Sequence, residues 1–293
     1  MYPLKVTAPT FFGFLLFCHS SSALEVSLGK GDFSMLADIN PLFSSDVKLS
    51  TSIWSLAERH KNIRDSKLYY QFQFDYFSSN TIDKITNFAS QPASTPIPPI
   101  DSSIDDGVDQ FTQIPVPADY QVRGIDFNIG LGYDLIETPK TTLGIAFNTG
   151  LSTPFMKIRN VERTANLVID LSDTFDTEVK TYKLGGSIYG EYKISKPLSL
   201  IGNASLNFQT GSMENGLLGS SIEVDGTYQT LNLSMRYQPS FLTDFYLTGG
   251  YNYKMWDYGS TTVNTPIGGT KVARGMGMDF SLSSLYFGAG YKF

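Results

Sequence analysis

The C-terminal stretch of the chain, residues 283–293, reads SSLYFGAGYKF and decides the fold. Its large or apolar side chains fall on every second position, counting back from the last residue: Phe293, Tyr291, Ala289, Phe287 and Leu285. Because successive side chains of a β-strand point to opposite faces, these residues share one face, while lysine, glycine and serine share the other. The stretch therefore predicts a strand with one face in an apolar environment and one in a polar environment.

This strand resembles the C-terminal signature of bacterial outer-membrane β-barrel proteins. In that class, a terminal Phe and an aromatic residue two positions earlier close the barrel and mark the chain for assembly, and Phe293 and Tyr291 match these positions. The resemblance indicates a broad class and no particular family. It implies a Gram-negative outer membrane, contact with its lipid and lipopolysaccharide, and recognition of the C-terminal strand by periplasmic chaperones and the barrel-assembly machinery.

The N-terminal residues predict export from the cytoplasm. Lys5 is the only charge before the apolar run FFGFLLF at residues 11–17, and small residues follow at 21–23. The run is shorter than the roughly 20 apolar residues that a membrane-spanning helix needs. We therefore expect residues 1–23 to be a removed signal peptide and residues 24–293 to form the barrel. A lipidated Cys18 fits less well because the large Phe17 precedes it.

Composition agrees with a membrane barrel and excludes other classes. Charged residues make up only 17% of the chain, whereas glycine (26), tyrosine (17) and phenylalanine (21) are abundant. A barrel that faces lipid outside and water inside needs this thin, alternating distribution of apolar side chains. The net charge of −6 and the lack of a basic stripe argue against nucleic acid as a partner. The mature chain would contain no cysteine and so no disulfide.

Alternation continues along the chain and predicts a single all-β domain. We expect a transmembrane, antiparallel, up-and-down barrel of about ten strands. The segments 167–171 and 177–181 would raise the count to twelve if they crossed the membrane. A soluble β-sandwich or a periplasmic barrel is the alternative, but its solvent-facing sides would carry more charge than the Gly, Ser, Asn and Thr found here. The expected strands are 24–33, 46–57, 68–76, 124–134, 143–148, 182–192, 198–209, 230–237, 245–254 and 283–293.

Connection lengths predict the orientation. Short connections at 58–65, 137–140, 195–197 and 238–244 alternate with connections near Pro41 and at 79–118, 157–177, 211–221 and 257–275, most of which are long. With an even number of strands and both termini in the periplasm, the long loops lie outside the cell. The loop at 79–118 is rich in proline and aspartate, and it could be a solvated surface loop, a plug or an adhesive tip.

Seven charged side chains are expected to line the lumen. They would form a salt-bridged polar core in a narrow barrel and a path for solutes in a wider one. Inner-face glycines leave room for such a path. The residues are Lys48, Asp75, Asp126, Lys183, Glu191, Arg236 and Lys254.

No catalytic, metal or cofactor site is expected, and the sequence predicts that the protein is not an enzyme. The mature chain has one histidine, His60, at a predicted periplasmic turn, and no second histidine or cysteine could share a metal with it. The first functional hypothesis is porin-like passage or binding of small solutes. The alternative is an adhesin or receptor that acts through its loops, followed by an outer-membrane enzyme.

Overall fold

A computed structural model describes the chain at residues 22–39, 43–60, 66–79, 83–92, 111–159, 162–163, 167–168, 176–215, 220–263, 270–272 and 276–293. No helix in these ranges is long and apolar enough to cross a membrane. The strands are β1 (Ser22–Ile39), β2 (Phe43–His60), β3 (Leu68–Ser78), β4 (Asp83–Pro92), β5 (Phe111–Glu137), β6 (Thr141–Arg159), β7 (Glu162–Arg163), β8 (Leu167–Val168), β9 (Thr177–Lys193), β10 (Leu198–Asn215), β11 (Ser220–Tyr237), β12 (Phe245–Val263), β13 (Thr270–Val272) and β14 (Met276–Lys292).

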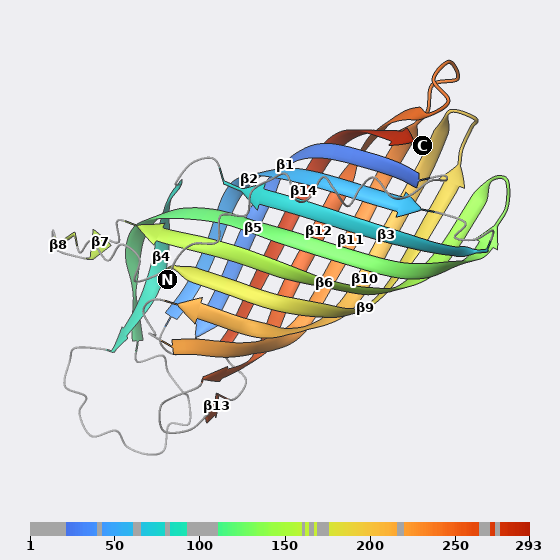
Figure 1. Cartoon of the computed structure of the whole chain (residues 1–293). Helices are drawn as coiled ribbons and strands as arrows, with labels where there is room; N and C mark the ends of the chain where they lie inside the picture. Colours follow the sequence, from blue (N-terminus) through green and yellow to red (C-terminus); the bar gives the residue numbers. More distant parts are fainter. Residues whose placement is uncertain are drawn as a thin grey trace, which may run out of the picture.

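Ten of the described strands form a closed antiparallel barrel, which confirms the predicted fold class and count (Figure 1). Their order around the wall is β1, β2, β3, β5, β6, β9, β10, β11, β12 and β14. The wall closes on β1, where Leu28 lies opposite Trp54 of β2 and Phe287 of β14. Closure pairs the backbone of every wall strand on both sides, as a protein in lipid requires.

The short strands lie at one end of the barrel, where β4 and β13 extend the sheet, and the C-terminus lies at the other end (Figure 1). β4 continues the position of β3 along β5, with Asp83 opposite Tyr120. Residues 83–92 and 111–118, expected in a loop, are therefore strand. Residues 177–181 belong to β9, and 167–168 pair with β7, so neither segment adds a strand to the barrel. We call the two ends the long-loop end and the short-turn end.

Near the short-turn end, the outward side chains form an apolar belt. On β14, Leu285 is 70% exposed and Phe287 is 63% exposed, so protein covers little of either side chain. The belt on this strand covers residues 285–293, close to the roughly 9–11 residues of a tilted transmembrane strand. Other wall strands contribute large exposed side chains to the belt: Val26, Leu28, Trp54, Tyr76, Ile125, Ile129, Leu131, Ile145, Phe147, Tyr182, Leu184, Ile188, Leu206, Phe208, Leu231 and Leu233.

Toward the long-loop end, the two faces of the wall exchange character: the apolar side chains point inward and the polar ones outward. On β5, Val122 points inward and is fully buried while Arg123 points outward, whereas below them Ile125 points outward and Asp126 inward. Outward positions above the belt are charged on most strands: Lys30, Asp32, Lys48, Arg123, Lys157, Glu178, Lys180, Glu214, Glu223, Asp225, Asp257 and Asp279. The barrel wall thus continues beyond the belt with a water-facing exterior and an apolar interior.

Candidate functional site

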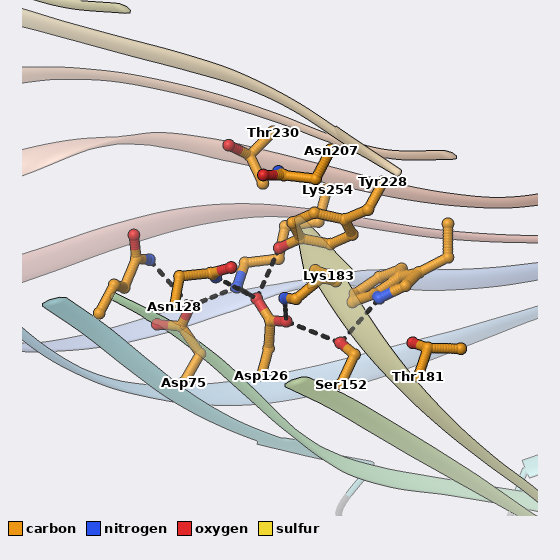
Figure 2. Close-up of polar contacts among 12 residues, drawn as sticks. Asp75, Asp126, Asn128, Ser152, Thr181, Lys183, Asn207, Tyr228, Thr230 and Lys254 are labelled. Atoms are coloured by element: carbon orange, nitrogen blue, oxygen red, sulfur yellow. Dashed lines mark hydrogen bonds and ion pairs between the residues drawn. The ribbon is translucent and has the colours of Figure 1, made fainter. Parts of the chain in front are cut away.

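An ionic network crosses the lumen at the upper edge of the belt (Figure 2). At its centre, the Asp126 carboxylate accepts hydrogen bonds from Lys183, Lys254 and Tyr228, with 2.5 Å between Lys254 Nζ and Oδ2 and 2.5 Å between the Tyr228 hydroxyl and Oδ2. Ser152 donates to Oδ1 at 2.6 Å. Strands β5, β6, β9, β11 and β12 supply these groups, so the network ties distant parts of the wall together.

The second carboxylate of the network is Asp75 on β3. It forms an ion pair with Lys254 and accepts a hydrogen bond of 2.8 Å from Gln73. The Lys183 ammonium also lies 3.9 Å from the centre of the Tyr228 ring, a cation–π contact. The two lysines and two aspartates are almost completely buried. Their charges balance, and buried charges need such pairing and hydrogen bonding.

An apolar cluster fills the lumen directly above this network. Its rings contact one another across the barrel, with centroid separations of 5.9 Å for Phe33–Phe77, 6.1 Å for Phe77–Trp256 and 5.4 Å for Tyr228–Trp256. Trp256 also donates a hydrogen bond of 2.8 Å to Ser152, which joins the cluster to the network. The remaining members are aliphatic or aromatic side chains from almost every wall strand: Met35, Val47, Leu49, Ile53, Tyr120, Val122, Met156, Val179, Met213, Val224, Tyr258, Phe280 and Leu282.

Inner-face glycines do not leave the lumen open, contrary to the room expected from the sequence. Gly124 lies directly opposite Phe77, and a Cβ on this glycine would lie 2.3 Å from Cζ of that ring. The aromatic ring of one strand thus occupies the space that glycine leaves on the next. The same cross-strand arrangement pairs Tyr69 with Gly132 and Tyr246 with Gly290.

Below the network, a polar cavity of about 490 Å³ extends to the short-turn end. On one side, the Arg236 guanidinium lies 4.4 Å from the centre of the Tyr246 ring and forms long ion pairs with Glu25 (4.0 Å) and Glu191 (3.9 Å). Amide and hydroxyl side chains line much of the remaining wall: Gln71, Gln73, Asn128, Thr142, Asn148, Ser187, Asn203, Ser205 and Thr230.

A second arginine, Arg59, also lines the cavity. Its guanidinium is held between the rings of Tyr69 (4.0 Å) and Tyr189 (3.7 Å) and donates a hydrogen bond of 2.6 Å to Asp134. The cavity is therefore lined by polar groups that already contact one another.

The structure places six of the seven predicted lumen residues inside the barrel. Asp75, Asp126, Lys183 and Lys254 form the network, and Glu191 and Arg236 line the cavity.

Lys48 lies on the opposite face of the wall. Its side chain is 67% exposed and forms an ion pair of 3.2 Å with Asp32, while its neighbours Val47 and Leu49 are fully buried. The prediction of an inward Lys48 is wrong because β2 crosses the level at which the apolar face turns from lipid to the interior.

Sequence analysis did not identify several residues of the site. Ser152, Tyr228 and Trp256 complete the network, and Arg59 with Asp134 forms a second buried ion pair. Their inward positions on alternating strands were the available signal. Their contacts join residues far apart in the chain, and those contacts depend on strand register.

His60 ends β2 at the short-turn end, where its ring stacks on Tyr70 with 4.9 Å between centroids. Within the described ranges, no group of three or more His, Cys, Asp or Glu side chains could hold a metal ion.

Comparison with known proteins identifies the fold and no family. No protein-family model matches the chain, and no curated protein matches it. Among solved structures, the outer membrane protease OmpT from Escherichia coli matches with a TM-score of 0.61 and 12% identity, covering 94% of this chain and 97% of that one.

Two other matches are less similar in structure. Ail, the attachment invasion locus protein of Yersinia pestis, has 11% identity and a TM-score of 0.33, covering 94% of this chain and all of that one. The Ralstonia pickettii toluene transporter TbuX has 11% identity and a TM-score of 0.31, covering 92% and 90%. The closed barrel, its apolar belt and the similarity to OmpT over nearly the whole chain show the fold of a bacterial outer-membrane β-barrel.

The prediction that the protein is not an enzyme is wrong as an exclusion. A solved structure with the same fold over nearly the whole chain is that of a protease, so this architecture is compatible with catalysis. At 12% identity the similarity carries the fold alone and assigns no catalytic residue to this chain.

Proposed function

We propose that the protein is a closed outer-membrane barrel that acts from the end projecting beyond the outer leaflet. Binding or processing of a partner at the cell surface would take place there. Among the described residues, the observation that carries this proposal is the continuous filling of the lumen by the apolar cluster and the ionic network. Solute passage was the first hypothesis from the sequence. A filled lumen favours the alternative hypothesis, a barrel that acts through its surface end.

The filled lumen also explains how the upper part of the wall is stabilised. A wall raised beyond the lipid needs its own buried core because water surrounds it, and the cluster provides that core. The ionic network beneath it supplies no continuous water path because both lysines and both aspartates are buried. Passage of a solute would require separation of paired charges in a dry interior.

Single-channel recording in planar bilayers tests the proposal. The refolded protein is expected to give no stepwise current, and proteoliposomes containing it are expected not to swell in small sugars. A known porin refolded in the same way serves as the positive control. Stepwise conductance of the parent protein would overturn the proposal and restore the channel hypothesis.

The proposal also requires the long-loop end to lie outside the cell, with both termini in the periplasm. A peptide tag inserted after Ser94, between β4 and β5, should then bind antibody on intact cells. A tag placed after Pro239, in the short turn between β11 and β12, should bind only after permeabilisation. The reverse result would invert the orientation.

The cavity at the short-turn end favours a second function, the binding of a small hydrophilic molecule from the periplasmic side. Its volume of about 490 Å³ falls within the usual range for small-molecule sites. Arg236 and Glu191 provide charges of both signs at its wall. A thermal-shift screen of sugars, amino acids and peptides against the parent and Arg236→Gln tests this function. Stabilisation of the parent alone would support it, and stabilisation of neither would exclude it for those ligands.

A further inference from the structure

The polar cavity at the short-turn end has one open end and one closed end. Glu137 and Lys193 belong to its lining and are exposed at the ends of β5 and β9, so a small molecule can enter between the short turns. At the opposite end, the buried ionic network separates the cavity from the apolar cluster. The cavity is therefore a blind pocket that a ligand enters from the short-turn end.

The charged side chains that line this pocket balance one another. Asp134, which lies outside the lining, adds one carboxylate and pairs with Arg59. The pocket as a whole therefore offers little attraction to a ligand of either net charge, and an uncharged hydrophilic ligand leaves no buried charge unpaired. The carboxylates of the lining are Glu25, Glu58, Glu137 and Glu191, and its cations are Arg59, Lys193, Arg236 and Lys292.

Arg236 faces two carboxylates of this lining across gaps that are too wide for direct hydrogen bonds. Its Nη2 lies 4.0 Å from Glu25 Oε2 and its Nη1 lies 3.9 Å from Glu191 Oε2, whereas an N–H···O hydrogen bond spans about 2.7 to 3.2 Å. Its Nε has no hydrogen-bond partner among the described residues. The Tyr246 ring, 4.4 Å away, holds the guanidinium by a cation–π contact and leaves its N–H groups available.

A hydroxyl group matches each of these two gaps. One hydroxyl oxygen can accept a hydrogen bond from the guanidinium and donate one to the carboxylate on the other side of the gap. A ligand carboxylate only accepts and would be repelled by Glu25 and Glu191, and a ligand ammonium only donates and would be repelled by Arg236. Glu191 already accepts a hydrogen bond of 2.9 Å from Tyr189, and an ionised carboxylate has further acceptor sites. The site therefore favours neighbouring hydroxyls on one uncharged ligand.

Side-chain amides on other strands supply hydrogen bonds for further hydroxyls. Each amide presents donors at its nitrogen and an acceptor at its oxygen, as a polyhydroxyl ligand requires. The volume of about 490 Å³ falls within the usual range for small-molecule sites. A sugar carries hydroxyls on adjacent carbons and no charge, so its chemistry matches this lining. The amides come from β3, β5, β6 and β10: Gln71, Gln73, Asn128, Asn148 and Asn203.

We propose that this pocket binds a neutral sugar of one or two rings, whose neighbouring hydroxyls bridge Arg236 to Glu25 and Glu191. The inference rests on the second function proposed above, the binding of a small hydrophilic molecule at the short-turn end. If amino acids or peptides bind and no sugar does, that function stands and this inference fails. Conductance of the parent protein would overturn the closed barrel without affecting sugar binding in detergent.

Isothermal titration calorimetry of the refolded protein tests the inference, in a detergent whose headgroup is not a sugar. The neutral probes are glucose, sucrose, maltose and lactose, and the charged probes are glucuronate, glucosamine and the zwitterion glycylglycine. At least one neutral sugar should bind saturably, and each charged probe should bind more weakly than that sugar. Arg236→Met keeps a long side chain and removes its donors, so it should weaken the sugar binding roughly 10- to 100-fold, as expected for lost hydrogen bonds to a charged group.

The matched control is Arg123→Met, because Arg123 is exposed on the outer wall, and this variant should bind the sugar as the parent does. Four results would overturn the inference: no saturable binding of any neutral sugar, tighter binding of a charged probe, unchanged affinity in Arg236→Met, or an equal loss in the control. A gel shift on heating verifies that each protein is folded. If Arg236→Met does not fold, Asn203→Leu, which puts an apolar side chain into the pocket and keeps Arg236, should abolish the binding. Unchanged affinity in that variant would equally overturn the inference.

Discussion

The two halves of this barrel use the same strands with opposite patterns. In the half near the short turns, apolar side chains face outward and polar ones fill the lumen, whereas in the half near the long loops, apolar side chains fill the lumen and charges face outward. The hydrogen-bonded ladders on both sides of β10 run without a register shift through both halves. The surrounding medium, lipid below and water above, therefore decides which face of each strand is apolar.

The ionic network marks the boundary between the halves, and breaking it should have one of the two largest effects on stability. Asp126→Asn removes the carboxylate that contacts both buried lysines, so it should lower the free energy of unfolding by about 3 to 5 kcal/mol. Urea unfolding of the refolded barrel, followed by tryptophan fluorescence, measures this loss.

Asp225→Asn is the control for that change because Asp225 is exposed on the outer wall. Its unfolding free energy should differ little from that of the parent. Equal losses in the two variants would show that the network does not stabilise the barrel.

The same truncation should have unequal effects in the two halves. Phe77→Ala, in the dry cluster, should cost about 3 to 5 kcal/mol because it leaves a cavity among packed rings. Phe147→Ala, on the belt, should cost less because Phe147 is 59% exposed on the protein and lipid can fill the space. Unfolding in bilayers measures the free energy of unfolding of both variants. Equal losses would contradict a difference in environment between the two positions.

Part of this architecture could be predicted from sequence. Alternation along β3 and β5 correctly separated outward Tyr76 and Ile125 from inward Asp75 and Asp126, because a two-residue period fixes the face of each side chain. Lys48 was assigned to the wrong face because alternation does not reveal which medium surrounds a strand. The level at which lipid gives way to water is a property of the whole wall.

The pairing of the lumen charges could not be predicted from sequence either. Lys183 and Lys254 lie 57 and 128 residues from Asp126 in the chain, so their contacts depend on the register of several strand pairs. Strand register also decides whether the space beside Gly124 is filled, because the ring of Phe77 that fills it belongs to the preceding strand of the wall. The fold class and most of the inward polar residues could be predicted from sequence, whereas the contacts among those residues form only when the barrel closes.

A charge placed on the outer wall should distinguish the two levels directly. Leu233→Arg puts a charge in the apolar belt and should cost about 2 to 4 kcal/mol near the membrane midplane. Glu223→Arg puts the same side chain on the same strand above the belt and should cost little because Glu223 is exposed among polar groups. Unfolding in bilayers of defined thickness measures both. Similar losses of unfolding free energy at the two positions would contradict the assignment of position 233 to lipid and position 223 to water.

The smallest effect should come from one methyl group on each face of the wall. Gly124→Ala directs a Cβ into the Phe77 ring at 2.3 Å, and the ring is packed on all sides, so overpacking should cost about 1 to 3 kcal/mol. Gly186→Ala directs the same methyl outward, where the nearest atom, the carbonyl oxygen of Ala146, is 3.4 Å away, and stability should change little. Adding Phe77→Leu to Gly124→Ala should recover part of the loss because the smaller side chain gives the methyl room. Independent, additive losses in that double variant would show that the glycine does not make space for the aromatic ring.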